Sequence, residues 1–206
     1  MAPGRVRLSA AERRAQIAAA AREVFIERGM NGTRSRDIAE QAGITEAYLY
    51  RHFHSKDEIF QLAIDAPLNE LIRRLRDETH DLALREDVDR TEVLLRAHEL
   101  LLGCMVDIAP LLAAALLSES GPHKRLYTAY LLPRLRDALV PTIPDITGLP
   151  VEAFDLDMFV DAMIGIHLTI ALEHLLEEEV LDVPRVAKQV TTMFATGVKG
   201  GARRAG

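Results

Sequence analysis

Side chains able to recognise another molecule through charge and hydrogen bonds are concentrated in residues 33–56. Arginine can donate two hydrogen bonds to a guanine edge, and lysine and tyrosine can contact phosphate oxygens. The whole chain lacks the Gly-rich phosphate loop, the nucleophile elbow and the cofactor fingerprint of many enzymes. These side chains could bind a molecule that carries phosphate groups and base edges. Such binding requires structural elements that hold the side chains in fixed positions.

The first predicted helix of this segment begins near residue 34 and ends at a glycine. Thr33 or Ser35 can cap it, because a short side-chain oxygen accepts a hydrogen bond from a free N–H group of the first turn. Ile38 and Ala39 fall on its predicted buried face. Gly43 follows, at a position that favours the left-handed conformation. The turn after it is expected to be anchored in the core by the next residue, an isoleucine.

A second helix is predicted from about residue 46 to 53. Thr45 supplies its N-cap, and Leu49 and Phe53 lie four residues apart, so both can face inward. Ser55 and Glu58 have the spacing of a capping box, which predicts a new and longer helix. Two short helices joined by a tight turn form a helix-turn-helix, which places its second helix in the major groove of DNA.

Over residues 10–60 the chain resembles the TetR family of bacterial transcriptional repressors. The residues that carry the resemblance are Ile17, Ala20, Ala21, Phe25 and Gly29 in the preceding helix, followed by Thr33, Asp37-Ile38-Ala39, Ala42-Gly43-Ile44-Thr45, Leu49-Tyr50-Arg51-His52-Phe53 and Lys56-Asp57-Glu58. The resemblance implies an all-α fold, with an N-terminal three-helix DNA-binding domain and a larger helical domain for ligand binding and dimerisation. We place these domains at residues 1–54 and 55–206, with the helix-turn-helix at about 34–53.

The resemblance also implies which residues contact DNA. The N-terminal part of the recognition helix, expected to approach base edges, holds Thr45, Glu46, Ala47 and Tyr48, while the positions that match phosphate contacts of the family are Tyr50, His52 and Lys56. Arg34 and Arg36, on the preceding helix, can reach phosphate or a guanine edge. Tyr50 and His52 can alternatively be scaffold residues that pack on the first helix.

Two residues of the recognition helix have unusual side chains for their positions. Glu46 departs from the family, which more often has a basic or neutral residue there. It can accept a hydrogen bond from cytosine N4, or it can serve only as a charge that stabilises the helix N-terminus, and we favour the second interpretation. Tyr48 is large for a base-reading position and can pack on a thymine methyl group.

The net charge of −6 is unevenly distributed. Residues 1–56 contain ten Lys or Arg and six Asp or Glu, whereas residues 57–206 contain 15 basic and 25 acidic residues. A basic head on an acidic body is expected when only the head touches phosphate.

The rest of the chain is predicted to be helical, with no period-2 strand pattern and no internal repeat. A first helix runs from about Ala10 to Arg28, with Ser9 and Glu12 as a capping box. Further helices are expected at about residues 56–80 with a kink or break at its proline, at 91–108, 110–118, 123–139, 152–178 and 184–196. Residues 141–150 are expected to form a loop. The glycines from residue 197 onward are expected to end the ordered part of the chain.

The last two predicted helices resemble the pair that forms a four-helix dimer interface in the family. Their candidate interface positions are Phe159, Met163, Ile166, Ile170, Val186, Val190, Met193 and Phe194. The alternative is that these apolar stripes bury into the core of their own protomer. A dimer is favoured, because a two-fold protein gains affinity from two half-sites.

The acidic body is expected to enclose a pocket for a small, largely apolar effector, as in the family. Candidate pocket residues are the polar or soft groups on apolar helices, namely His98, Cys104, Met105, Tyr127, Tyr130, Met163 and His167. Each can instead be an ordinary core residue, since methionines commonly fill gaps. Glu173, His174 and Glu177 lie near His167 in sequence, but no spacing typical of a metal site is present, and no metal or cofactor is predicted.

The sequence therefore predicts a cytoplasmic, homodimeric, ligand-released repressor that binds a pseudo-palindromic operator in double-stranded DNA. The single cysteine excludes an intrachain disulfide, and neither a secretory signal nor an uninterrupted apolar run of membrane-spanning length is present, so no membrane contact is expected. Two alternatives remain open: a DNA-binding protein controlled by a partner protein, and a helical enzyme.

Overall fold

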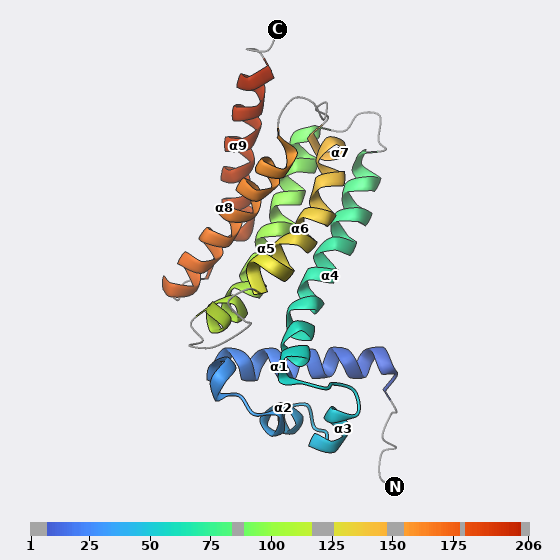
Figure 1. The fold of residues 1–206 in the computed structure, drawn as a ribbon. Coiled ribbons are helices and arrows are strands. Elements are labelled where there is room, and N and C mark those ends of the chain that lie inside the picture. The colour runs from blue at the N-terminus through green and yellow to red at the C-terminus, as the bar shows by residue number, and fades with distance from the viewer. Residues whose placement is uncertain (1–7, 84–88, 117–125, 148–154, 178–179, 203–206) are drawn as a thin grey trace.

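Helices make up all the regular structure of the described residues in the computed structural model, which confirms the all-α fold (Figure 1). The structure describes residues 8–83, 89–116, 126–147, 155–177 and 180–202. In chain order the elements are α1 (Ala10–Gly32), α2 (Ser35–Gln41), α3 (Glu46–Tyr50), α4 (Lys56–Ala83), α5 (Arg90–Leu116), the π-helical turn η2 (Leu126–Leu131), α6 (Leu132–Leu139), the 3-10 turn η3 (Val140–Thr142), α7 (Ile143–Thr147), α8 (Leu156–Glu177) and α9 (Val183–Ala202).

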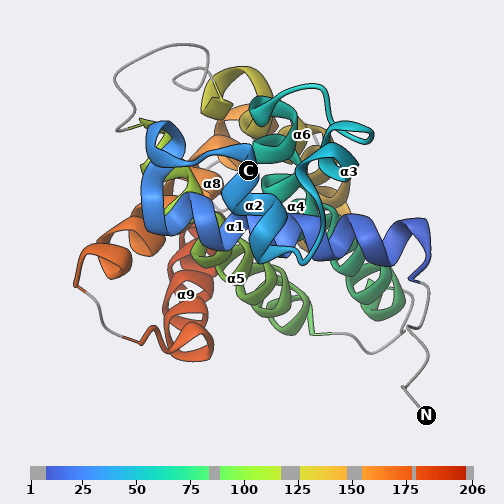
Figure 2. The ribbon, with the colours of Figure 1, turned by 90° about the horizontal axis from the view of Figure 1, so that it is seen from below.

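A small head and a larger body are joined through α1 and α4. Helix α1 runs across the lower end of the body, with α2 and α3 beneath it, and α4 rises from the head into the body (Figures 1 and 2). Helix α5 is the centre of the molecule, because it contacts α1, α4, α7, α8 and α9. The edge-to-face contact of the Phe25 and Phe60 rings, whose centroids are 4.8 Å apart, lies where α1 meets α4.

Local hydrogen bonds and backbone conformation determine where helix α1 begins and ends. The Ser9 side chain accepts from the Glu12 N–H group and the Glu12 carboxylate accepts from the Ser9 N–H group, which confirms the predicted capping box. At the other end, Gly29 adopts φ 67°, and a kink there precedes the last turn. The Thr33 hydroxyl donates to the Gly29 carbonyl at 2.7 Å, so it closes α1 instead of capping α2.

Several predicted helix ends differ from the structure. The expected separate helix at 110–118 is wrong, because α5 continues through Pro110, and α4 likewise continues through Pro67. The expected loop at 141–150 contains η3 and α7, with residues 148–150 outside the described part. Helix α9 runs to Ala202, so Gly197 does not end it. Residues 117–125, 152–154 and 178, which include parts of the expected helices, lie outside the described residues.

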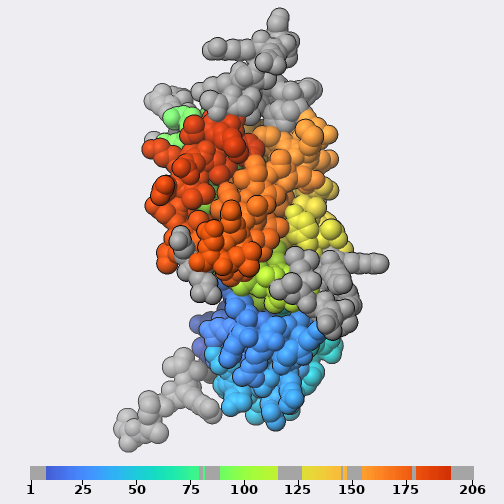
Figure 3. All heavy atoms as spheres, turned by 90° about the vertical axis from the view of Figure 1, so that its left-hand side faces the viewer, coloured from blue at the N-terminus to red at the C-terminus, as the bar shows by residue number. Residues whose placement is uncertain are grey.

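Two described helices meet the length and mean hydropathy of a membrane span, although neither contains an uninterrupted apolar run of that length. In α5, 61% of the apolar window is buried in the fold, as expected for a core helix that five others contact. In α8 the buried share is only 28%. Much apolar surface of α8 therefore faces outward, on the side of the body seen in Figure 3.

Candidate DNA-binding surface and effector-binding body

The turn between α2 and α3 has the geometry that the sequence predicts. Gly43 adopts φ 62°, and the Ile44 N–H group donates to the Ala39 carbonyl at 2.9 Å. The Thr45 side chain then accepts from the Tyr48 N–H group at 3.1 Å, which confirms it as the N-cap of α3. Helix α3 ends at Tyr50, three residues earlier than expected.

The start of α2 is formed differently from the prediction. Arg34 is its N-cap residue, and the Asp37 carboxylate accepts from the Arg34 N–H group at 3.1 Å. This backbone hydrogen bond is the largest of the effects that lower the pKa of Asp37, ahead of its ion pair with Arg28 at 3.1 Å. Ser35 is buried and accepts a hydrogen bond from Tyr50 instead of capping the helix.

Contacts from α1 fix the position of this pair of helices. The Gln16 side chain donates to the Ala42 carbonyl at 2.9 Å, at the end of α2. On the inner side Ile38, Leu49 and Phe53 are fully buried, as predicted. Ile44 is partly buried and packs on the same core. The head therefore holds α3 as a rigid element with one face directed outward.

The outward face of α3 begins with three predicted base-edge residues. Thr45, Glu46 and Ala47 are exposed on the first turn of α3, and Arg34 and Arg36 are exposed on the neighbouring α2. Figure 2 shows α2 and α3 together on the side of α1 that faces away from the body. All five residues are therefore accessible to solvent in the head.

The Tyr48 ring makes cation–π contacts with two arginines that were not predicted from the sequence. Its half-buried ring lies 4.6 Å from the Arg51 guanidinium carbon and 5.8 Å from that of Arg13, and 4.8 Å from the exposed His52 ring. Arg51 follows Tyr48 by three residues, a spacing that predicts neighbours on a helix. The contact with Arg13 on α1 depends on the tertiary fold, so no sequence spacing could reveal it.

Two predicted phosphate-contacting residues have intramolecular partners. The Tyr50 hydroxyl donates to Ser35 Oγ at 2.8 Å, yet the tyrosine remains 48% exposed. The Lys56 ammonium donates to the carbonyls of Met30 and Thr33, at 2.6 and 3.1 Å. Lys56 thereby joins the start of α4 to the end of α1, and both residues act as scaffold with polar atoms still near the surface.

The body contains a buried histidine pair among the predicted pocket residues. His98 on α5 and His167 on α8 are each fully buried, and His98 Nδ1 lies 3.0 Å from His167 Nε2. His167 Nδ1 lies 2.6 Å from the carbonyl oxygen of Met163. Burial lowers the pKa of His98 to about 3 and that of His167 to about 4, so both are neutral at pH 7.

The other predicted pocket residues lie elsewhere in the body. Tyr130 donates to Asp65, and Arg134 contacts both, which makes a polar cluster between α4 and α6. Met105 is buried, and Tyr127 is partly buried. Burial raises the pKa of the Cys104 thiol to about 12, which leaves it protonated. The contacts therefore bring together His98, His167 and Met163, and place Tyr130 in a different cluster.

The predicted interface residues divide between core and surface. Val190 is buried in the protomer, and Phe194 packs on Phe159 and on the His98 ring, at centroid distances of 5.3 and 5.1 Å. Met193 is 54% exposed. Ile166, Ile170 and Val186 are partly buried. The sequence reasoning missed three other exposed apolar residues in this region: Met158, Leu176 and Val180, at 67%, 82% and 99%.

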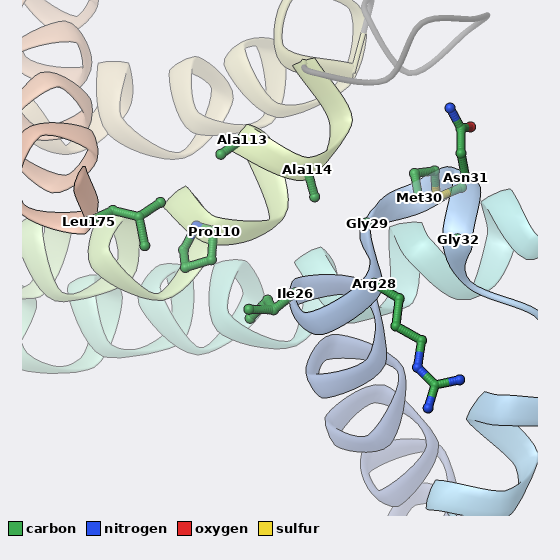
Figure 4. A pocket seen from close by; sticks show the side chains of 10 residues that line it. All are labelled: Ile26, Arg28, Gly29, Met30, Asn31, Gly32, Pro110, Ala113, Ala114 and Leu175. Atoms are coloured by element: carbon green, nitrogen blue, oxygen red, sulfur yellow. The ribbon is translucent and has the colours of Figure 1, made fainter. Parts of the chain in front are cut away.

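Hollows formed by described residues include four with volumes between about 320 and 430 Å³. One of about 380 Å³ lies where α1 meets the body, with Ile26 opposite Pro110, Ala113 and Ala114 (Figure 4). Cys104 lines a second hollow between α4, α5 and the start of α9, while the other six predicted pocket residues line none of the four. Within the described residues, no group of three or more His, Cys, Asp or Glu is placed to hold a metal ion.

Comparison with known proteins assigns the head to a family. The model of "Bacterial regulatory proteins, tetR family" matches residues 17–63. The HTH-type transcriptional activator FasR of Mycolicibacterium smegmatis is 36% identical over 93 residues, which are 45% of this chain and 40% of FasR. The HTH-type transcriptional regulator TtgR of Pseudomonas putida is 38% identical over 89 residues, 43% of this chain and 38% of TtgR. The chain thus matches less than half the length of either relative.

The fold of the whole chain also has solved counterparts. The transcriptional regulator FadR of Bacillus subtilis, solved in complex with stearoyl-CoA, superposes with a TM-score of 0.68. The superposition covers 89% of this chain and 98% of FadR, at 18% identity. At this identity the likeness shows a shared fold alone. The three proteins compared here are all named as regulators of transcription, and none is named as an enzyme.

Proposed function

Because residues 17–63 of this chain are a DNA-binding domain of the TetR family, we propose that the protein is a homodimeric transcription regulator. It binds a pseudo-palindromic operator through two α3 helices and is released by a small, largely apolar effector in the body. Residues 1–54 form the DNA-binding domain, and residues 55–206 form the effector-binding and dimerisation domain. Repression is the expected mode, although one relative of the head is named an activator.

The single observation that carries the proposal is the outward face of α3. Thr45, Glu46 and Ala47 are exposed at its N-terminal end, which is the part of a recognition helix that contacts base edges. Arg34, Arg36 and Arg51 are exposed beside it and supply positive charge for phosphate or guanine. Tyr48, His52, Tyr50 and Lys56 complete the contact surface.

The exposed side of α8 supports a dimer of this chain. Met158, Ala162, Thr169 and Leu176 are exposed and follow helical spacing along one face. An added Cβ at Gly165, on the same face, would meet no atom within 4 Å. An apolar face with small residues at its middle allows a second helix to approach closely. We propose that α8 of a second copy packs on this face, because a two-fold dimer presents two heads to DNA.

The exposed face also bears on the alternative of control by a partner protein. An apolar patch is what a protein partner would bind, so the patch on α8 favours some protein interface. We assign that interface to the second copy and propose that the effector binds inside the body. The stearoyl-CoA bound to the FadR counterpart is an example of a small molecule in the same fold.

Selection of bound sequences from a random DNA pool, performed at two salt concentrations, tests this function. The expected result is enrichment of one pseudo-palindrome, with binding that weakens as salt rises. The selection is repeated with Tyr48→Phe and Ala47→Ser. A variant of a residue that contacts base edges should change the enriched sequence, whereas a variant of a residue that only positions α3 should leave that sequence unchanged. Salt-sensitive binding without any enriched sequence would remove Thr45, Glu46, Ala47 and Tyr48 from the role of base readers and would contradict the proposed regulator.

A further inference from the structure

The two buried histidines form a hydrogen-bonded chain with one possible direction. A carbonyl oxygen only accepts, so His167 Nδ1 must carry the proton that it shares with the Met163 carbonyl at 2.6 Å. In a neutral ring this leaves His167 Nε2 as an acceptor. His98 Nδ1, 3.0 Å away, must then be the donor.

The direction of the chain fixes the state of its last atom. Because His98 Nδ1 carries the proton, His98 Nε2 holds a lone pair and no hydrogen. This nitrogen is buried and has no hydrogen-bond partner among the described residues. A buried polar atom without a partner is costly, so a group that donated to it would gain both a hydrogen bond and relief of that cost.

The aromatic side chains that contact the His98 ring are uncharged. The His98 ring contacts the Phe194 ring on α9, and Phe194 packs edge-to-face on Phe159 of α8. Both phenylalanines are only partly buried, so the aromatic cluster extends from the buried imidazole toward the surface. The lowered pKa of His98 arises from burial and from His167, with no contribution from any carboxylate or ammonium group.

We propose that His98 Nε2 is the anchor of the effector site, and that it selects a neutral, mainly apolar molecule carrying a hydroxyl or N–H donor. The inference rests on the proposed effector control and names the chemistry of its ligand. A carboxylate or an ether oxygen would place one lone pair against another and is disfavoured. His98 lines none of the four hollows, so binding must displace a neighbour of its ring, and Phe194 of α9 is one such neighbour.

Two isomeric probes test the anchor directly. The compounds m-cresol and anisole contain the same atoms and an aromatic ring of similar size, but only m-cresol has a hydroxyl donor. Binding of each to the full-length protein is measured by calorimetry, and the imidazole nitrogen resonances of His98 are followed in the same titrations. We expect m-cresol to bind roughly three- to tenfold more tightly than anisole. Only m-cresol should shift the Nε2 resonance.

Variants separate the anchor from nonspecific binding. His98→Phe keeps an aromatic ring and removes the acceptor, so it should abolish the preference for m-cresol. His174→Phe changes a histidine on α8 outside the pair and should leave the preference intact. If His98→Phe fails to fold, the wild-type resonance still decides the question. Equal binding of the two probes, or an Nε2 resonance already typical of a hydrogen bond to water and unchanged by m-cresol, would overturn the inference.

Operator binding, measured on the same preparation, keeps the two proposals apart. A protein that binds its operator but shows no preference between the probes lacks the anchor and retains the regulatory function. A protein that prefers m-cresol without binding any DNA sequence has the anchor but is not the regulator proposed above.

Discussion

At the scale of single residues, Lys56 has an observed role in the scaffold and a proposed role in DNA binding. Its ammonium group satisfies the Met30 and Thr33 carbonyls and so holds α1 and α4 together. An ammonium group has three donors, so one remains for a phosphate oxygen. The two scaffold contacts therefore leave a donor for the proposed DNA contact.

Lys56→Ala should therefore weaken binding to all DNA sequences. The slope of log affinity against log salt concentration should become shallower by about one unit. The measurement is operator affinity at a series of salt concentrations, by fluorescence anisotropy. Lys188→Ala, which removes an exposed lysine from α9, is the matched control and should leave the slope unchanged. Lys56→Ala with lower thermal stability but an unaltered slope would show that Lys56 is scaffold alone.

The histidine pair predicts how stability depends on pH. The pKa values of His98 and His167, about 3 and about 4, lie below the ordinary 6.5, so the unfolded chain binds protons first as the pH falls. The stabilisation is fully present above pH 6.5 and is lost as the pH falls toward those values. Each histidine contributes a slope of up to about 1.4 kcal/mol per pH unit in the free energy of unfolding.

Denaturant unfolding between pH 6.5 and about 5, before most carboxylates titrate, measures this slope. His98→Phe should make it shallower, whereas His174→Phe should have little effect on the part that comes from the buried pair. A slope that is the same in wild type and His98→Phe would show that the pair is not the source of the pH dependence.

At the scale of elements, the sequence predicted the head far better than the body. Capping groups and glycines act over a few residues, so Ser9, Thr45 and Gly43 could be assigned from spacing alone. The role of Thr33 could not, because its hydroxyl bonds back to the Gly29 carbonyl in a kinked last turn. The sequence predicts a break between residues 108 and 110, but packing of α5 against five other helices outweighs the hydrogen bond lost at Pro110.

The candidate site shows the same division. Exposure of Thr45, Glu46 and Ala47 follows from the helical period once Leu49 is assigned to the core. The pairing of His98 with His167 could not be predicted, because the two residues are separated by 69 positions and meet only when α5 packs on α8. Both residues could be predicted as pocket candidates from their type, but their contact depends on the packing of α5 against α8.

The turn between α2 and α3 gives a prediction at this scale. Gly43→Ala should lower the free energy of unfolding by about 1–2 kcal/mol, because alanine is strained at φ 62°. Gly103→Ala in the middle of α5 should instead raise it by up to about 1 kcal/mol. An added Cβ meets no atom within 4 Å at either site, so backbone conformation alone separates the pair. Equal effects in denaturant unfolding would contradict the turn geometry.

At the scale of the whole molecule, the head and body are connected by packing and little charge. Helix α1 contacts both α4 and α5, and among the described residues one ion pair, between Arg22 and Asp107 at 3.2 Å, joins head and body. These side chains are 30% and 55% exposed, so the pair is screened and contributes little. A change of packing in the body can therefore alter the position of α1 at little cost from this ion pair, while the Lys56 contacts keep the end of α1 attached to α4.

The proposed dimer is tested by placing a charge on its face. Ala162→Glu puts a carboxylate on the exposed face of α8, and Ala66→Glu puts one on an exposed position of α4. Only the first should shift the protein toward a folded monomer in sedimentation velocity and weaken operator binding, because a buried unpaired charge opposes association. If the two variants sediment alike, the α8 face is not the interface.

The central claim, that two α3 helices of a dimer read one operator, is tested most directly by footprinting on the sequence selected from the random pool. The account predicts two symmetric protected patches whose centres lie about 10–10.5 base pairs apart, or a whole multiple of that distance, so that both recognition helices face the same side of the duplex. Both patches should disappear together in Ala162→Glu. A single protected patch of unchanged affinity in that variant would contradict the account, because it would show that one head is sufficient for recognition.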